Sequence, residues 1–145
     1  MRNRLFLVWE FSQPNWVKPP SPPKNFQLIR RDYRTLTQAK VAFLIVSNDP
    51  EKVLPGLVMA RRLKENRGAD VRVLFFGPAV KTAVSGLLDE AVQALAEAGI
   101  SPKACSALVD QYELSSDYAA RPIELLAAGA EVEAWSTHGY TVLTF

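Results

Sequence analysis

The sequence feature that most constrains the fold is an alternation of short apolar runs with segments of helical spacing. Residues 41–46 (VAFLIV) form a continuous apolar run rich in β-branched side chains, and a second run covers residues 71–76. Such runs are typical of strands buried on both faces of a parallel sheet. Between them, residues 51–66 carry apolar side chains at helical spacing, after a loop, 47–50, that offers capping oxygens and a helix-compatible proline. The pattern predicts a strand-helix-strand unit.

The alternation continues to residue 145. The remaining predicted elements are a helix over 87–98 with Gly99 as its left-handed cap, a strand over 100–105, a short helical stretch over 123–128, and strands over 131–135 and 140–145. Pro102 cannot donate to a strand ladder, which makes it a strand start, a bulge or a mark of the sheet edge. Residues 40–145 are therefore predicted to form an α/β domain with three layers, α/β/α, around a mainly parallel five-stranded sheet.

Residues 1–39 are predicted to form a separate N-terminal arm. The arm holds five of the ten prolines and favours polyproline II structure, and its basic side chains outnumber its acidic ones. Its aromatic residues, such as Trp9 and Trp16, are unusual for a solvated tail. We expect the arm to dock on its own domain or on a neighbouring subunit. The alternative is an adventitious extension from a start codon upstream of the true one.

Composition and motifs exclude several classes of function. A net charge of +2 is too small to predict nucleic-acid binding, and no apolar run approaches the ~20 residues of a membrane span. We read no export signal in the first residues, and a single cysteine forms no internal disulfide and no zinc cluster, so a cytoplasmic location is expected. The sequence lacks GxGxxG and Walker motifs, and the 47–50 loop has one hydroxyl, fewer than a flavin-phosphate loop would use. No cofactor and no metal are predicted.

Candidate functional residues follow from the rule that open α/β sheets bind ligands beyond the carboxyl ends of their strands. The stretches to inspect are residues 47–49, 77–81, 105–106 and 135–138. Cys105 is the main candidate because a thiolate at such an edge can attack a substrate, and Lys103 is the nearest cation that could lower its pKa. The alternative is a buried structural cysteine, since free cysteine often behaves as a small apolar side chain.

The weaker candidates are polar side chains of the same predicted edge. Ser47, Asn48 and Asp49 follow the first strand, although Asp49 is explained by helix capping alone. His138, the single histidine, could act as an acid or a base, or could simply be exposed. Tyr112 and Tyr118 could line a pocket or cover the core.

Residues 40–145 resemble the DsrE/DsrF-like family of small sulfur-handling proteins. The resemblance rests on residues 41–50 (VAFLIVSNDP), 71–78 (VRVLFFGP), 98–105 (AGISPKAC) and 139–145 (GYTVLTF), in that order. It implies that Cys105 matches the cysteine that carries a persulfide in family members that relay sulfur, and that the chain forms a homo-oligomer, a trimer or a hexamer. The arm has no counterpart in the minimal family domain.

A lone thiol restricts the mechanism that the resemblance implies. Residues 106–117 contain no second cysteine, so Cys105 could accept sulfane sulfur only as a persulfide and would have to pass it to an external thiol. A sulfurtransferase-like carrier would thus need donor and acceptor proteins. The second hypothesis is a non-enzymatic oligomeric binding or assembly module with Cys105 buried in its core.

Overall fold

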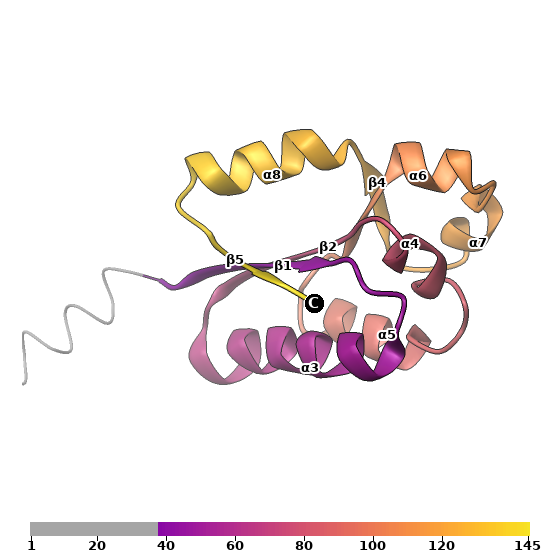
Figure 1. Ribbon diagram of the computed structural model, residues 1–145. Helices are drawn as coiled ribbons and strands as arrows, with labels where there is room; N and C mark the ends of the chain where they lie inside the picture. The colour runs from indigo at the N-terminus through magenta and orange to yellow at the C-terminus, as the bar shows by residue number, and fades with distance from the viewer. Residues whose placement is uncertain (1–37) are drawn as a thin grey trace, which may run out of the picture. The chain divides into compact units, whose positions relative to one another are not determined.

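A five-stranded parallel sheet organises residues 38–145, which are the residues that the computed structural model describes (Figure 1). The spatial order is β4-β3-β2-β1-β5, and every neighbouring pair is parallel. The strands are β1 (Lys40–Ile45), β2 (Asp70–Phe75), β3 (Lys103–Cys105), β4 (Glu124–Leu126) and β5 (Thr141–Thr144). The predicted α/β class is confirmed, with an all-parallel sheet. The predicted arm falls almost wholly outside the described residues.

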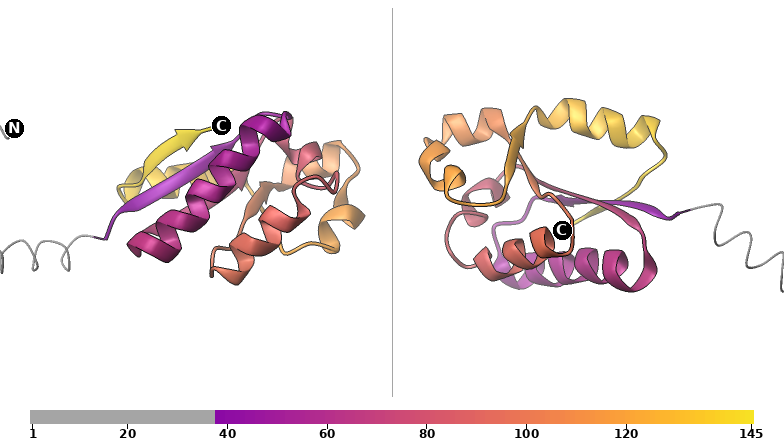
Figure 2. Two further views of the ribbon diagram at one scale, coloured as in Figure 1. Left: turned by 90° about the horizontal axis from the view of Figure 1, so that it is seen from below. Right: turned by 180° about the vertical axis from the view of Figure 1, so that it is seen from behind.

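Helices form a layer on each side of the sheet (Figures 1 and 2). Helices α3 (Pro50–Arg67) and α5 (Asp89–Glu97) cover one face. Helix α8 (Ala128–Thr137) lies on the other face, and α6 (Ser106–Gln111) lies on the same side beyond it. The short helices α4 (Ala79–Thr82) and α7 (Ser115–Ala119) lie at the end of the domain toward which β1 and β2 run. Of the described helices, none is both long and apolar enough to cross a membrane.

Local sequence explains where α3 begins, ends and packs. Asp49 caps its first turn, Pro50 occupies the first helical position, and Gly68 ends it in the left-handed conformation with a φ of 65°. Gly56 lies on the buried side, where an added Cβ would stand 2.8 Å from Cγ of the Phe145 ring. A residue without a side chain at this position therefore lets the end of the chain pack closely on α3.

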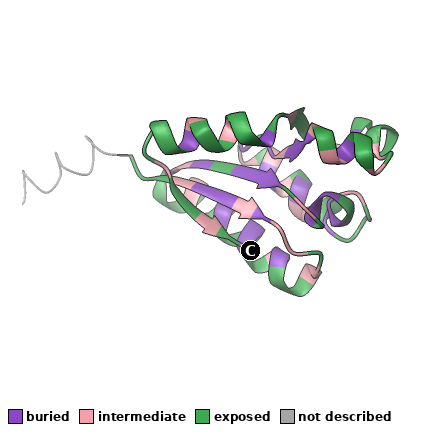
Figure 3. Cartoon of the chain, turned by 45° about the horizontal axis from the view of Figure 1, so that its top comes forward, coloured by how far each residue is buried: buried purple, intermediate pink, exposed green. Residues whose placement is uncertain are grey.

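The larger core lies between the sheet and helices α3 and α5. Phe43 and Ile45 of β1 and Val73 and Phe75 of β2 point to this side and are fully buried, and Leu57 of α3 packs against them. Figure 3 shows how the buried residues gather on the sheet and on the inner sides of the helices. Most of the apolar burial that stabilises the domain is therefore on this face.

The smaller core lies between the sheet and α8. It consists of Ala42, Leu74, Cys105, Ala128 and Trp135. Ala128 and Trp135 stand two helical turns apart, so one narrow stripe of α8 meets the strands. One short helix thus covers only part of this face.

Two predicted elements near the end of the chain are wrong. Residues 131–135 were expected as a strand but lie within α8, and residues 123–128 were expected as a helix but contain β4. The alternation of Glu131, Val132 and Glu133 imitates a strand, whereas the decisive spacing is the helical one from Ala128 to Trp135. A three-residue strand such as β4 is too short to give a recognisable period.

Pro102 marks the start of a strand. The predicted strand over 100–105 is shorter in the structure, where β3 begins at Lys103. Since β3 lies between β2 and β4, Pro102 does not mark the sheet edge. Its carbonyl instead accepts a hydrogen bond from the amide of Glu124, at 2.9 Å, just ahead of the β3–β4 ladder.

Candidate functional site

The carboxyl ends of the parallel strands meet at one edge of the sheet, as expected for a ligand-binding edge. The loop after β1, the turn at Gly77 after β2, and Cys105 at the end of β3 all lie there. This edge brings together most of the predicted site residues. It divides them, however, between the α8 side of the sheet and a cavity near α4.

Cys105 is a buried residue on the α8 side. Its exposed fraction is 6%, it forms no disulfide, and it packs with Leu74, Ala128 and Trp135 in the smaller core. Its backbone occupies the N-cap position of α6 without a capping hydrogen bond from the side chain. In this setting the thiol behaves as a small apolar group.

Lys103 is engaged by a carboxylate rather than by the thiol. Its Nζ donates to both carboxylate oxygens of Glu131 at 2.9 Å, and the two side chains are 13% and 11% exposed. Trp135 Nε1 also donates to Glu131, at 3.0 Å. Within residues 38–145, no hydrogen bond joins the Lys103 ammonium to Cys105. The ammonium thus ties β3 to α8, and its charge is compensated by Glu131.

Ser47 and Asp49 serve the loop itself. Asp49 Oδ1 accepts a hydrogen bond from the Glu51 amide at 3.0 Å, and Ser47 Oγ accepts one from the Asp49 amide at 3.1 Å. The first contact caps α3, and the second holds the turn that precedes the helix. Asn48 differs, because its backbone oxygen accepts from Thr82 Oγ1 at 3.3 Å while the residue itself is exposed.

A cavity of about 400 Å³ adjoins this loop, and we refer to it as the Lys81 cavity. It is lined by Asn48, Pro78, Lys81, Thr82, Ser85, Leu87 and Tyr112. Lys81 Nζ stands 4.1 Å from the centroid of the Tyr112 ring, a cation–π contact. The cavity joins two predicted residues, Asn48 and Tyr112, to three polar residues that sequence reasoning did not name individually. The sheet-edge rule had pointed to residues 77–81 and so contained the signal for Lys81.

His138 lies at the opposite edge of the sheet. Its expected place beyond a strand end was wrong because the residues before it form α8, which returns the chain to the start of β5. The ring Nδ1 is 2.7 Å from the Ala134 carbonyl oxygen, and Lys40 Nζ donates to the His138 carbonyl at 3.0 Å. His138 and Cys105 therefore belong to different regions of the domain.

Tyr118 covers the larger core. Its hydroxyl donates to the Val80 carbonyl at 2.6 Å, and burial raises the pKa of Tyr118 well above its ordinary value. The phenol is thus held neutral and acts as a structural donor. Of the two tyrosines that the sequence left open, Tyr112 lines a cavity and Tyr118 belongs to the core.

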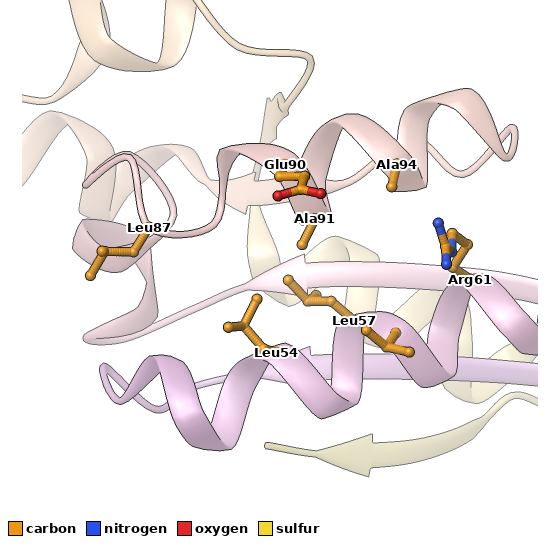
Figure 4. Close-up of a pocket in the computed structure, with 8 residues that line it drawn as sticks. Leu54, Leu57, Arg61, Leu87, Glu90, Ala91 and Ala94 are labelled. Carbon is orange, nitrogen blue, oxygen red and sulfur yellow. The ribbon is translucent and has the colours of Figure 1, made fainter.

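A second hollow, of about 290 Å³, lies between α3 and α5 (Figure 4). Leu54 and Leu57 form its α3 wall and Ala91 belongs to its α5 wall, with Arg61 and Glu90 also lining it. Its walls are mainly apolar and carry no nucleophile among the described residues. This groove is therefore suited to apolar contact and not to catalysis.

The α8 side of the sheet also carries a partly exposed and mainly apolar area, which we call the open face: Leu44, Val46, Phe76, Val142 and Thr144. Strand alternation directs these side chains to the same side as Ala42 and Leu74. Phe76 continues the β2 ladder, because its amide donates to the Ile45 carbonyl at 2.9 Å. Phe76 and Val142 are 41% and 43% exposed, and Leu44 and Val46 are half-buried.

Comparison with known proteins finds similar solved structures but no similar family model. The sequence matches no protein-family model and no curated protein. The structure is similar to a conserved protein of unknown function from Bacteroides thetaiotaomicron, with a TM-score of 0.66 and 18% identity over 73% of this chain and 94% of that one. It is also similar to the ychN protein of E. coli, with a TM-score of 0.60 and 20% identity over 75% of this chain and 100% of that one.

The domain has the DsrE/DsrF-like fold. The fold that the sequence resemblance implied is therefore confirmed. At this level of identity the likeness extends to the DsrE/DsrF-like fold alone, since one fold supports many functions. Function has to be argued from Cys105, the Lys81 cavity and the open face.

Proposed function

We propose that this domain is a non-catalytic binding module that assembles with further copies of itself through the open face. Cys105 then serves as a structural residue of the smaller core. The observation that carries the proposal is the exposure of Phe76 and Val142 on a sheet face that α8 covers only in part. Contiguous apolar surface of this kind marks interaction sites in soluble proteins.

A second copy is the occupant that suits this surface best. None of the five residues that define the open face is charged. The exposed Arg72, which stands beside Ala42 on the same side of the sheet, is engaged by Asp70 and Tyr140. Two copies related by a two-fold axis would therefore meet with little like-charge repulsion. The face also reaches β5, whose outer side pairs with no other strand of the described domain and would extend the contact. The resemblance favours the same conclusion through its expectation of a trimer or a hexamer.

Sedimentation of the full chain tests the assembly. We expect the wild type to sediment above the monomer mass, and Val142→Lys to shift it to the monomer because a lysine at the contact would be buried without a partner. Val58→Lys is the matched control, because Val58 is 39% exposed on α3, away from the open face. A monomeric wild type, or equal masses for wild type and Val142→Lys, would refute the proposal.

Sulfur carriage by Cys105 is the second candidate. One observation favours it: Cys105 lies at the junction of β3 and α6, at the carboxyl edge of the sheet. In this reaction the Cys105 thiolate would attack the outer sulfur of a donor persulfide, forming a Cys105 persulfide and releasing the donor thiolate. An external acceptor thiolate would then take the outer sulfur and release the Cys105 thiolate. The burial of Cys105 and the engagement of Lys103 by Glu131 rank this candidate second.

Intact-mass measurement separates the two roles of Cys105. After incubation with glutathione persulfide, a carrier gains one sulfur atom, and Cys105→Ala gains none. A structural cysteine gains none in the native state, and an alkylating reagent modifies it only after unfolding. Rapid alkylation of native Cys105 would contradict the structural role, and absence of added sulfur would contradict the carrier.

A further inference from the structure

The Lys81 cavity has the features of a ligand site that neither proposed role of the domain uses. It opens at the carboxyl edge of a parallel sheet, where ligands of open α/β folds bind. Its volume of about 400 Å³ lies within the range of small-molecule sites. The lining comes from three separate parts of the chain: the loop after β1, the α4 region, and the residue that ends α6.

The Lys81 ammonium is exposed to solvent at the cavity, and the described domain supplies no counter-charge for it. Lys81 forms no ion pair with any residue of the described domain, and none of the described lining residues is acidic. The carboxylates nearest in sequence to Asn48 and Tyr112 have other partners: Asp49 caps α3, and Asp110 accepts a hydrogen bond from Ser115. A cation in a concave site without a protein counter-charge attracts an anion.

The walls around Lys81 are held in place by internal hydrogen bonds. Thr82 Oγ1 donates to the Asn48 carbonyl at 3.3 Å, which links α4 to the loop after β1. Ser85 Oγ donates to the Thr82 carbonyl at 2.7 Å and accepts from the Leu87 amide at 3.3 Å. These hydroxyls are engaged with the backbone, so the side-chain donors that remain for a ligand are the Lys81 ammonium, the Asn48 amide and the Tyr112 hydroxyl.

The remaining walls are apolar. Pro78, Leu87 and the Tyr112 ring line the cavity beside the ammonium. A ligand that fits has one anionic group for Lys81 and Asn48 and an apolar body for the other walls. A single cation matches a monoanion better than a phosphate dianion, whose second charge would find no partner here.

We propose that the Lys81 cavity is a binding site for a small organic monoanion, a carboxylate with an apolar body. Lys81 pairs with the carboxylate, the Asn48 amide donates a second hydrogen bond to it, and Tyr112 contacts the body while holding Lys81 in place. This site is independent of the open face, which lies on the α8 side of the sheet.

Titration of the full chain with benzoate, followed by amide NMR, tests the site. We expect saturable shifts centred on Asn48, Lys81 and Tyr112, a loss of affinity of about tenfold or more in Lys81→Gln, and near wild-type affinity in Lys81→Arg. Lys64→Gln, at the far end of α3, is the control and should bind as the wild type does. The Val142→Lys variant should also bind benzoate normally, which separates this test from that of the assembly.

Two further probes define the ligand class. Benzamide, a neutral analogue, should bind at least about tenfold more weakly than benzoate if the charge on Lys81 is used. Inorganic phosphate should bind more weakly than benzoate at the same residues. Equal binding of benzamide and benzoate, tighter binding of phosphate, or an unchanged affinity in Lys81→Gln would each overturn the proposal.

Discussion

The two faces of the sheet differ in how completely they are covered. Toward α3 and α5, four side chains of β1 and β2 are fully buried: Phe43, Ile45, Val73 and Phe75. Toward α8, the next residue along, Phe76, is 41% exposed. Adjacent residues at the end of β2 thus have different physical roles: the first face stabilises the monomer, and the second leaves surface for binding.

Chain topology explains this asymmetry. The chain passes from β1 through β2 and β3 to β4 in one direction across the sheet, and right-handed crossovers of this kind place their helices on one face. The return from β4 to β5 crosses the other face with a single helix, α8, and α6 of the β3–β4 connection lies beyond α8 on that side, toward the carboxyl ends of the strands. A ten-residue helix cannot cover five strands.

The largest expected contrast is between Phe75→Ala and Phe76→Ala. Phe75→Ala should lower the free energy of unfolding by about 3–5 kcal/mol, because it opens a cavity in the larger core. Phe76→Ala should cost less than about 1 kcal/mol, because the side chain already contacts solvent. Urea denaturation at low protein concentration measures both without a contribution from assembly. Equal losses would show that the two faces contribute alike.

The next contrast concerns the polar contact under α8. Glu131→Gln should cost about 3 kcal/mol in unfolding free energy, because it leaves the mostly buried Lys103 ammonium without its counter-charge. The double variant Lys103→Met with Glu131→Gln should recover most of this loss, since both charges are then absent. Urea denaturation of the single and double variants measures the coupling. Additive losses would mean that the pair does not hold α8 to β3.

The smallest effect concerns Tyr118 in the larger core. Because burial raises the pKa of Tyr118 above its ordinary 10.0, the folded state keeps the phenol neutral while an unfolded chain ionises it. Its contribution to stability is therefore complete below about pH 10 and is lost as the pH rises beyond that value. Tyr118→Phe should cost about 1 kcal/mol near neutral pH through the bond to Val80, and should flatten the alkaline decline.

The control for this pH effect lies on the other face. Tyr140 is half-buried, and its hydroxyl donates to Asp70 at 2.6 Å; burial, followed by this hydrogen bond, raises the pKa of Tyr140. Its burial is less complete, so Tyr140→Phe should change the alkaline decline less than Tyr118→Phe does. Denaturation curves between about pH 8 and pH 11 compare the two variants. A larger effect of Tyr140→Phe on the alkaline decline would contradict its attribution to Tyr118.

The parts of the fold that the sequence predicted are those with long, unambiguous patterns. The runs at 41–46 and 71–76 became central strands, and the helix between them follows its capping signals closely. Gly99 adopts a φ of 78° just after α5, as its predicted role at the helix end requires. The exchange of helix and strand in residues 123–135 arose because β4 is short and α8 contains a strand-like alternation.

The candidate site was only partly predictable. Which of its residues come together depends on the side of the sheet toward which each side chain points. The sheet-edge rule selected Cys105, Asn48 and the segment containing Lys81. It could not show that Cys105 turns into the α8 core or that Lys103 meets Glu131, since both contacts follow from the placement of α8. His138 was misplaced for the same reason.

The pairing of β1 with β5 has a consequence for how the domain folds. Val41 stands opposite Thr141, so this contact joins residues far apart in the chain, whereas the β1–β2 unit is closed by α3 alone. Long-range parallel pairing is slow because loop entropy must be lost before contacts form. We expect β1, β2 and α3 to form the early nucleus, and α8 and β5 to dock last. Newly made chains would then pass through an intermediate in which the α8 side of the sheet is exposed to solvent. Two such chains would be able to associate through this side before folding is complete.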